Sequence, residues 1–177
     1  MVLMIVVREL KMKKQIRFIL FETNSSSVHT LQISNNNMTV SELNIEDDGY
    51  VHVVLDQYYG KDPIDYDTQL DKLKYICTWL YIFYGCDLEK MYDSSGWSDF
   101  IYEFTKYINK TNYQNQKKCL GIKVILTDKK EAWEFLDHQS QPYGVWDDSN
   151  CVVDLWNSEQ LVNFIFNPYI WLHTDCD

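Results

Sequence analysis

The sequence has few chain-breaking residues and no long apolar run: its 177 residues include only 3 prolines and 6 glycines. So few breakers argue against a disordered or linker-rich chain. The apolar run at residues 1–7 is too short to span a membrane, and no basic region precedes it as in a secretory signal. No other stretch reaches about 18 apolar residues. We therefore expect a globular chain in the cytoplasm, with no membrane as a partner.

The sequence also lacks the spacings of the common disulfide, metal and nucleotide motifs. Its five cysteines are an odd number, without a CxxC pair or a histidine pair at zinc spacing. A calcium loop starting at Asn44 would need a glutamate at its twelfth position, where Leu55 stands. P-loop and GxGxxG motifs are absent. We therefore expect no metal, no cofactor, and buried free thiols in a reducing cytoplasm. The cysteines are Cys77, Cys86, Cys119, Cys151 and Cys176.

The sequence is rich in acidic and aromatic residues. It contains 26 acidic and 16 basic residues, for a net charge of −10, and 15% of its residues are aromatic. Residues 22–104 carry fifteen acids against four bases, whereas residues 105–126 carry five lysines and no acid. Binding to a phosphate backbone depends on lysine and arginine, so we expect no direct nucleic-acid binding.

The length and the hydrophobic content of 46% predict one domain with its own core. Met12 is followed by two lysines and resembles a second translation start. We therefore expect residues 1–11 to be an N-terminal extension and residues 12–177 to be a single α+β domain. Three explanations of residues 1–11 stay open: an extended start, a weakly ordered arm and an extra edge strand.

Sequence periodicity predicts an α+β fold with one mixed, mostly antiparallel sheet and helices packed on one face. The first strands should form an antiparallel meander. Thr68, Ser98 and Ser158 are expected to be N-caps, and Gly85 should end the first helix. The expected strands are 14–21, 28–34, 38–43, 50–55, 119–126, 151–155 and 169–172, and the expected helices are 70–83, 97–108, 128–138 and 158–166.

The most distinctive segment is FETNSSSVH at residues 21–29, with three serines between two predicted strands. Hydroxyls and free backbone N–H groups in one tight turn can bind an anion or phosphate. His29, at the start of the second strand, could orient or deprotonate a hydroxyl. The alternative is a turn whose hydroxyls bond to their own backbone. The residues concerned are Asn24, Ser25, Ser26, Ser27 and His29.

The longer segment at residues 12–31, MKKQIRFILFETNSSSVHTL, resembles the N-terminus of a group of uncharacterised small proteins of phages and prophages of low-GC bacteria. Members share a strand that leads into FETNSSS, one further residue and a histidine. The DHQS at residues 137–140 is similar to a downstream motif of that group. The resemblance implies a phage origin and the cytoplasm of a bacterial host, and it implies no activity.

If both motifs line one pocket, they combine two imidazoles, a carboxylate and several hydroxyls, which suffices for acid–base or nucleophilic chemistry. Asp137 would then orient His29 rather than its own neighbour. The alternative for residues 137–140 is a helix C-terminus, where His138 interacts favourably with the helix dipole. The candidate catalytic residues are Ser25, Ser26, Ser27, His29, Asp137 and His138, with Asn24, Gln139 and Ser140 as binding residues.

A second candidate site is the acidic stretch at residues 42–71, which holds nine acids, one base and several tyrosines. Tyrosines suit protein interfaces, and spread carboxylates can stand in for phosphates in the basic groove of a nuclease. The alternative is a solvated loop that leads into a helix. The candidate binding residues are Glu46, Asp47, Asp48, Tyr58, Tyr59, Asp62, Asp65 and Asp67, with Tyr50 and Tyr66 among the interleaved tyrosines.

Three functions remain open at this stage. The leading hypothesis is a phage-encoded protein that binds and inhibits a host defence or metabolic protein, such as an anti-CRISPR or another anti-defence inhibitor whose target binds nucleic acid. The second is a small hydrolase or transferase that acts on a nucleotide or phosphorylated substrate. The third is a structural or assembly factor without a catalytic site.

Overall fold

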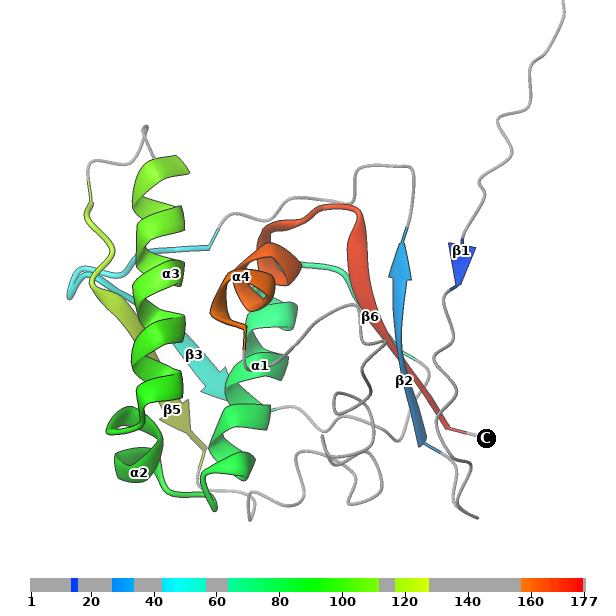
Figure 1. Ribbon diagram of the computed structural model, residues 1–177, viewed down its shortest axis with the longest axis horizontal. Helices are drawn as coiled ribbons and strands as arrows, with labels where there is room; N and C mark the ends of the chain where they lie inside the picture. The colour runs from blue at the N-terminus through cyan, green and yellow to red at the C-terminus, as the bar shows by residue number, and fades with distance from the viewer. Residues whose placement is uncertain are drawn as a thin grey trace, which may run out of the picture.

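A computed structural model describes residues 14–15, 27–33, 43–56, 64–111, 117–127 and 157–176, with only the backbone described at 14–15, 27–33, 64–65 and 170–176. The chain combines helices with strands, so the predicted α+β class is confirmed (Figure 1). The expected strands 38–43 and 151–155 and the expected helix 128–138 lie outside the described residues, except for Leu43, which is not in a strand. The elements in chain order are β1 (Lys14–Gln15), β2 (Ser27–Ile33), β3 (Tyr50–Leu55), β4 (Ile64–Tyr66), α1 (Gln69–Phe83), α2 (Leu88–Tyr92), α3 (Ser95–Thr111), β5 (Gly121–Leu126), α4 (Ser158–Phe166) and β6 (Ile170–Cys176).

The described strands form two sheets rather than the one mixed sheet expected. One is antiparallel, with the strand order β1-β2-β6-β4, and the other is the parallel pair β3-β5. The expectation was wrong at β3, which was placed in the first meander but runs parallel to β5, from Tyr50 opposite Gly121 to Leu55 opposite Leu126. A parallel pair needs a long crossover, and the helices α1 to α3 lie in the connection between these two strands.

Helix α1 begins and ends as the sequence predicted. The Thr68 hydroxyl accepts the N–H of Asp71 at 3.0 Å and donates to the Asp71 carboxylate at 2.6 Å, which resembles a capping box. At the other end, Gly85 has φ +73° and donates its N–H to Ile82, while the N–H of Cys86 bonds to Tyr81. These two bonds form a Schellman motif, which glycine favours because it adopts positive φ without strain.

Two predicted N-caps are displaced by one turn or one residue. Helix α3 begins at Ser95, and its N-terminal N–H groups are capped by the Ser94 hydroxyl, which accepts from Trp97 at 3.1 Å. Ser98 lies inside that helix and donates to the Ser94 carbonyl instead. Helix α4 is capped by Asn157, whose side chain accepts from Gln160. In both cases a neighbouring polar side chain competes for the same orphan N–H groups, and sequence spacing does not choose between them.

Two short elements were missed. Strand β4 has three residues, and helix α2 has five, which is too short for apolar periodicity to show. Asp87 caps α2 by accepting from the N–H groups of Glu89 and Lys90. Strand β6 runs four residues beyond its expected end because it pairs with β2 along its whole length.

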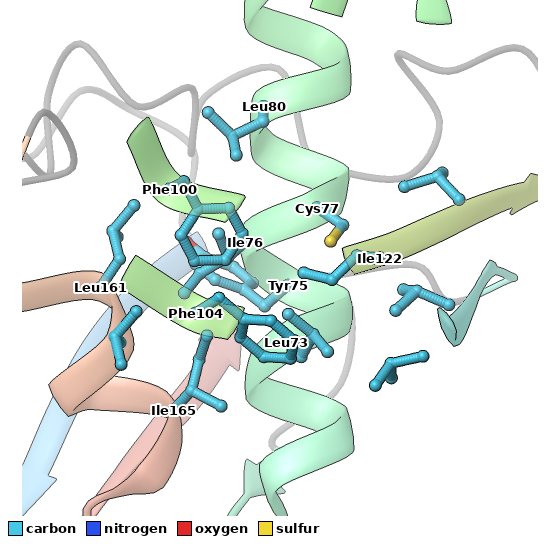
Figure 2. Packing of buried hydrophobic residues seen from close by; sticks show 14 of the residues in the cluster. Leu73, Tyr75, Ile76, Cys77, Leu80, Phe100, Phe104, Ile122, Leu161 and Ile165 are labelled. Carbon is cyan, nitrogen blue, oxygen red and sulfur yellow. The ribbon is translucent and has the colours of Figure 1, made fainter. Parts of the chain in front are cut away.

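The core lies where three helices meet the parallel pair. Helix α1 contacts β3 and α4, and α3 contacts α4 and β5, so α1 and α4 lie between the two sheets (Figure 1). Figure 2 shows the side chains that converge there, among them Ile76, Phe100, Phe104 and Ile165, which are at most 1% exposed. The apolar residues that recur at helical spacing in α1 and α3 therefore face the core, except for Leu70 and Tyr107, which are 38% exposed. No helix in the described part of the chain is both long and apolar enough to span a membrane.

Candidate functional site

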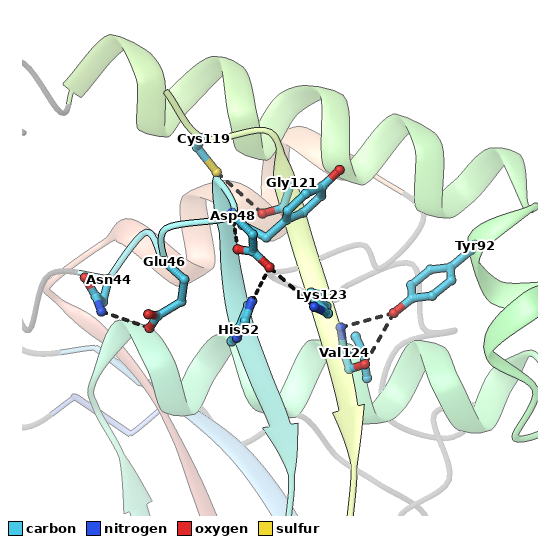
Figure 3. Close-up of polar contacts among 10 residues, drawn as sticks. Asn44, Glu46, Asp48, His52, Tyr92, Cys119, Gly121, Lys123 and Val124 are labelled. Carbon is cyan, nitrogen blue, oxygen red and sulfur yellow. Dashed lines mark hydrogen bonds and ion pairs between the residues drawn. The ribbon is translucent and has the colours of Figure 1, made fainter. Parts of the chain in front are cut away.

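An acidic turn, which includes Glu46, Asp47 and Asp48, precedes β3 (Figure 3). The Glu46 N–H donates to the Tyr50 carbonyl at 2.9 Å, and the Gly49 N–H donates to the Glu46 carbonyl at 3.0 Å. Gly49 has φ +85°, and a Cβ at this position would approach Cδ1 of Leu120 to 2.9 Å. The turn therefore needs glycine for its backbone angle, whereas the exposed Leu120 side chain could shift to admit a Cβ.

Asp48 is the centre of a polar cluster beside this turn (Figure 3). Its Oδ2 lies 2.8 Å from Nε2 of His52 and 3.3 Å from Nζ of Lys123, and its Oδ1 accepts the N–H of Tyr50 at 3.1 Å. The hydrogen bond with His52, helped by those from Tyr50 and Lys123, lowers the pKa of Asp48 to about 2. The carboxylate consequently stays ionised far below neutral pH.

A second ion pair joins Asp47 to Lys117, with 2.7 Å between Oδ1 and Nζ. The hydrogen bond lowers the pKa of Asp47 and raises the pKa of Lys117. Since both side chains are largely exposed, the pair adds little to stability. The pair instead marks where two segments that are far apart in the sequence meet. The acidic segment and the lysine-rich segment come together at this end of the β3–β5 sheet.

Exposed apolar side chains lie among these charges. Tyr50 is 36% exposed and Leu120 is 51% exposed, and the Leu120 N–H donates to the Gly49 carbonyl at 2.8 Å. The Asn109 side chain of α3 bonds both backbone groups of Cys119, at 2.8 and 2.9 Å, and so fixes the segment before β5. We name this surface the turn patch; it consists of Asp47, Asp48, Tyr50, His52, Lys117, Leu120 and Lys123.

Only some of the residues of the predicted acidic surface lie close together in the structure. Glu46, Asp47 and Asp48 share one turn, but the two aspartates are paired with lysines. Tyr66 is only 3% exposed and belongs to the core, so its expected place in an interface was wrong. Asp67 precedes α1, and Asp65 lies in β4, where its backbone alone is described. Tyr58, Tyr59 and Asp62 lie outside the described residues.

Only two of the predicted catalytic residues lie in the described chain. His29 lies in β2, opposite Thr174 of β6, which agrees with its expected place near the start of a strand. Ser27 was expected in the turn but is the first residue of β2, opposite Cys176. The other catalytic candidates, Ser25, Ser26, Asp137 and His138, lie outside the described residues, and so do the binding candidates Asn24, Gln139 and Ser140.

Sequence reasoning missed His52, Lys117 and Lys123 as members of a site. His52 follows Asp48 by four residues across a glycine turn. That spacing was visible in the sequence. The two lysines could be suspected only from the opposite charges of their segments, because their contacts depend on the parallel pairing of β3 with β5.

The cysteines of the described side chains are free thiols, as predicted, but not all are buried. Burial raises the pKa of Cys77 and of Cys119, which makes both poor nucleophiles. Cys86 is exposed, which corrects the expectation of a buried thiol. It follows Gly85 and has φ +62°, so the Schellman motif carries it out of the core.

Comparisons with known proteins add no relative. No protein-family model matches the chain, and no curated protein or solved structure matches it either.

In the described residues, no group of three or more histidine, cysteine, aspartate or glutamate side chains is arranged to hold a metal ion.

The Asp48 cluster makes a specific titration prediction. In the wild-type protein, the Asp48 carboxylate should titrate near pH 2, because His52 stabilises its ionised form. His52→Ala should raise that midpoint toward the ordinary value of about 3.9. The measurement is an NMR titration of the side-chain carboxyl carbon. A midpoint that stays near pH 2 in His52→Ala would assign the shift to Tyr50 and Lys123 instead.

Proposed function

We propose that this chain is a phage-encoded protein that binds and inhibits a host protein in the bacterial cytoplasm. The observation that carries the proposal is the turn patch, where exposed Tyr50 and Leu120 lie among paired charges from two distant segments. The phage origin rests on the resemblance of residues 12–31. The class of target we propose is a defence protein, by analogy with anti-CRISPR inhibitors.

The composition of the turn patch suits a protein partner. Tyrosine is enriched among the residues that dominate binding energy, and a polar rim around an apolar centre is the usual anatomy of an interface. Here the apolar centre is formed by Tyr50 and Leu120, and the rim by the Asp47–Lys117 and Asp48–Lys123 pairs. Such exposed ion pairs are weak, so a partner can exchange them for its own at small cost.

The patch is also held in one conformation before binding. Hydrogen bonds from Glu46, Gly49 and Leu120 fix the backbone around Tyr50, and Asn109 fixes Cys119. A surface that is already ordered loses less conformational entropy on binding, which favours affinity. Because each aspartate in the patch has a lysine beside it, we propose recognition of a protein surface of mixed charge, and not mimicry of a phosphate chain by these two acids.

We further propose that residues 12–177 form a single domain. Helix α4 packs on α1 and α3, which cover the β3–β5 pair, and α4 continues directly into β6 of the other sheet. This continuous packing supports one cooperative unit, and the substitution of Phe104 described in the Discussion tests it.

The binding proposal predicts that Tyr50→Ser combined with Leu120→Ser abolishes capture of the host partner. Each hot-spot side chain contributes about 2 kcal/mol or more, so the double variant should bind about a thousandfold more weakly. The measurement is affinity capture from a host lysate, identification of the partner by mass spectrometry, and a binding titration with the purified partner. The activity of that partner should fall when wild-type chain is added.

A matched double variant controls for the loss of exposed apolar area. Tyr169→Ser with Leu126→Ser removes a tyrosine and a leucine that are 41% and 40% exposed and lie outside the turn patch. This control should bind like the wild type. Equal binding by both double variants would show that the turn patch is not the interface, and a partner whose activity is unaffected would contradict inhibition.

A second candidate function is a small hydrolase or transferase acting on a nucleotide or phosphorylated substrate. It is favoured by one observation: Ser27 and His29 are two residues apart in β2 and therefore belong to the same face of the sheet. Failure of the binding experiment would leave this candidate in place, because Ser27 and His29 are not part of the turn patch.

A further inference from the structure

A tyrosine of α2 covers the outer edge of β5, the edge that points away from β3 (Figure 3). The Val124 N–H donates to Oη of Tyr92 at 3.1 Å, and the Tyr92 hydroxyl donates to the Val124 carbonyl at a longer 3.5 Å. Among the described strands, β5 pairs with β3 alone. The Tyr92 hydroxyl therefore occupies the position in which the backbone of a further strand would bind Val124.

The contact with Tyr92 shows which residues of β5 point to this outer edge. The N–H and C=O groups of one strand residue point to the same side, and those of the next residue point to the other side. Since both groups of Val124 meet Tyr92, those of Ile122 and Leu126 also point to the outer edge, while those of Lys123 and Ile125 point toward β3. Tyr92 thus covers the middle one of three pairing positions.

The neighbours of Tyr92 in the chain hold it at this edge. Met91 is 0% exposed, and the Ser94 hydroxyl donates to its carbonyl at 2.7 Å. The ring of Tyr92 lies 5.4 Å from that of Trp97, which is only 6% exposed. Tyr92 itself is 36% exposed, so it covers the edge from the surface and can be replaced without removing a core side chain.

The sequence of β5 explains why its edge needs a cover. The strand reads GIKVIL, with one charged residue, no proline and a majority of β-branched or apolar residues. Short segments with high β-propensity, low charge and no proline pair edge to edge when they are exposed. Proteins prevent such pairing by covering the edge with another element, and α2 supplies that element here.

We propose that the outer edge of β5 is a self-association site and that Tyr92 keeps the chain monomeric by covering it. The occupant is the same strand of a second copy, because an edge can pair with its own copy about a two-fold axis whenever the resulting register is self-complementary. Two β3–β5 pairs joined in this way would form one sheet of four strands, which is a usual size.

The register of such a pair is self-complementary when the two-fold axis passes through Val124. Each Val124 then lies opposite its own copy, and Ile122 lies opposite Leu126, so that residues whose backbone groups point outward meet one another. Lys123 lies opposite Ile125 of the other copy. The two lysines consequently do not face each other, and like charges directly opposite would have been unfavourable.

The first test is sedimentation velocity of the full chain over a range of protein concentrations. Tyr92→Ala should add a monomer–dimer step that the wild type lacks, seen as a sedimentation coefficient that rises with concentration. Tyr102→Ala removes a tyrosine of α3 that is 64% exposed, and it should sediment like the wild type. Adding Leu126→Lys to Tyr92→Ala should abolish the new step, because lysine at a sheet edge opposes pairing. Leu126 is 40% exposed, so the monomer tolerates this change.

The second test is amide hydrogen exchange of Tyr92→Phe, which keeps the ring and removes only the hydroxyl. In dilute protein, the Val124 amide should exchange about tenfold faster than in the wild type, while the Ile125 amide, which points toward β3, should not change. If Tyr92→Ala loses cooperative unfolding, Tyr92→Phe replaces it in the sedimentation experiment.

Three results would overturn the proposal. One is a Tyr92 variant that sediments like the wild type at every concentration, and another is a dimer that persists after Leu126→Lys. The third is an unchanged exchange rate of the Val124 amide in Tyr92→Phe. None of these results bears on the proposed inhibition of a host protein, because neither Tyr92 nor Val124 belongs to the turn patch.

Discussion

Replacing Phe104 with alanine is expected to lower the free energy of unfolding by about 3–5 kcal/mol. Phe104 is fully buried, and its ring lies 6.0 Å from that of Phe100 and 5.7 Å from that of Phe166. The substitution removes a large apolar side chain where α3 meets α4 and leaves a cavity that the surrounding helices fill only in part. The measurement is chemical denaturation followed by circular dichroism.

Tyr102→Ala is the matched control for this substitution. Tyr102 is also an aromatic residue of α3, but it is 64% exposed, so its removal should change the free energy of unfolding by less than about 1 kcal/mol. If the chain is one domain, Phe104→Ala should shift a single transition without splitting it. Two unfolding transitions, of which only one shifts, would contradict the single-domain proposal. A decrease in the free energy of unfolding as small as that of Tyr102→Ala would contradict the packing of Phe104 between α3 and α4.

Local features of this fold could be predicted from the sequence. The start of α1 at Thr68, its end at Gly85 and the whole of β3 follow from cap chemistry and from residue alternation over a few positions. The apolar stripe of α3 predicted its buried face for the same reason. These features depend on interactions within one or two turns of chain, which a single sequence displays directly.

Non-local features could not be predicted in the same way. Nothing in residues 50–55 distinguishes a third strand of a meander from one strand of a parallel pair, because the alternation of buried residues is the same in both. The choice depends on which apolar faces the helices cover. The turn patch shares this dependence: Lys117 and Lys123 reach Asp47 and Asp48 only because β5 pairs beside β3.

The burial of Lys72 in the core could not be predicted from the sequence. Lys72 stands among apolar residues of α1, and it is only 1% exposed. Its Nζ donates to the Asn167 carbonyl at the end of α4, at 2.8 Å, and lies 5.6 Å from the ring centre of Phe164. A cation near the C-terminus of a helix is favourable, so Lys72 ties α1 to α4 through a charge-assisted bond.

Burial has an electrostatic cost at this position. Loss of solvent lowers the pKa of Lys72 to about 8, although Asp67 acts in the opposite direction. In the unfolded chain the same amine titrates near 10.4. Between these two values the unfolded state holds a proton that the folded state has lost, so the free energy of unfolding rises with pH in this window. Below about pH 8 both states are protonated, and the full cost of burying the ammonium is present.

Lys72→Met should therefore abolish the rise in the free energy of unfolding that burial of this amine causes at alkaline pH. Relative to this variant, the free energy of unfolding of the wild type should rise by about 2–3 kcal/mol between about pH 7 and pH 10. The measurement is denaturant unfolding of both proteins at matched pH values, so that tyrosines and thiols titrating in the same range cancel in the difference. Lys74→Met removes a lysine two residues along α1 that pairs with Asp56 at 2.9 Å, and it should keep the alkaline rise. A difference between wild type and Lys72→Met that is flat across this range would show that Lys72 is not desolvated in the folded state.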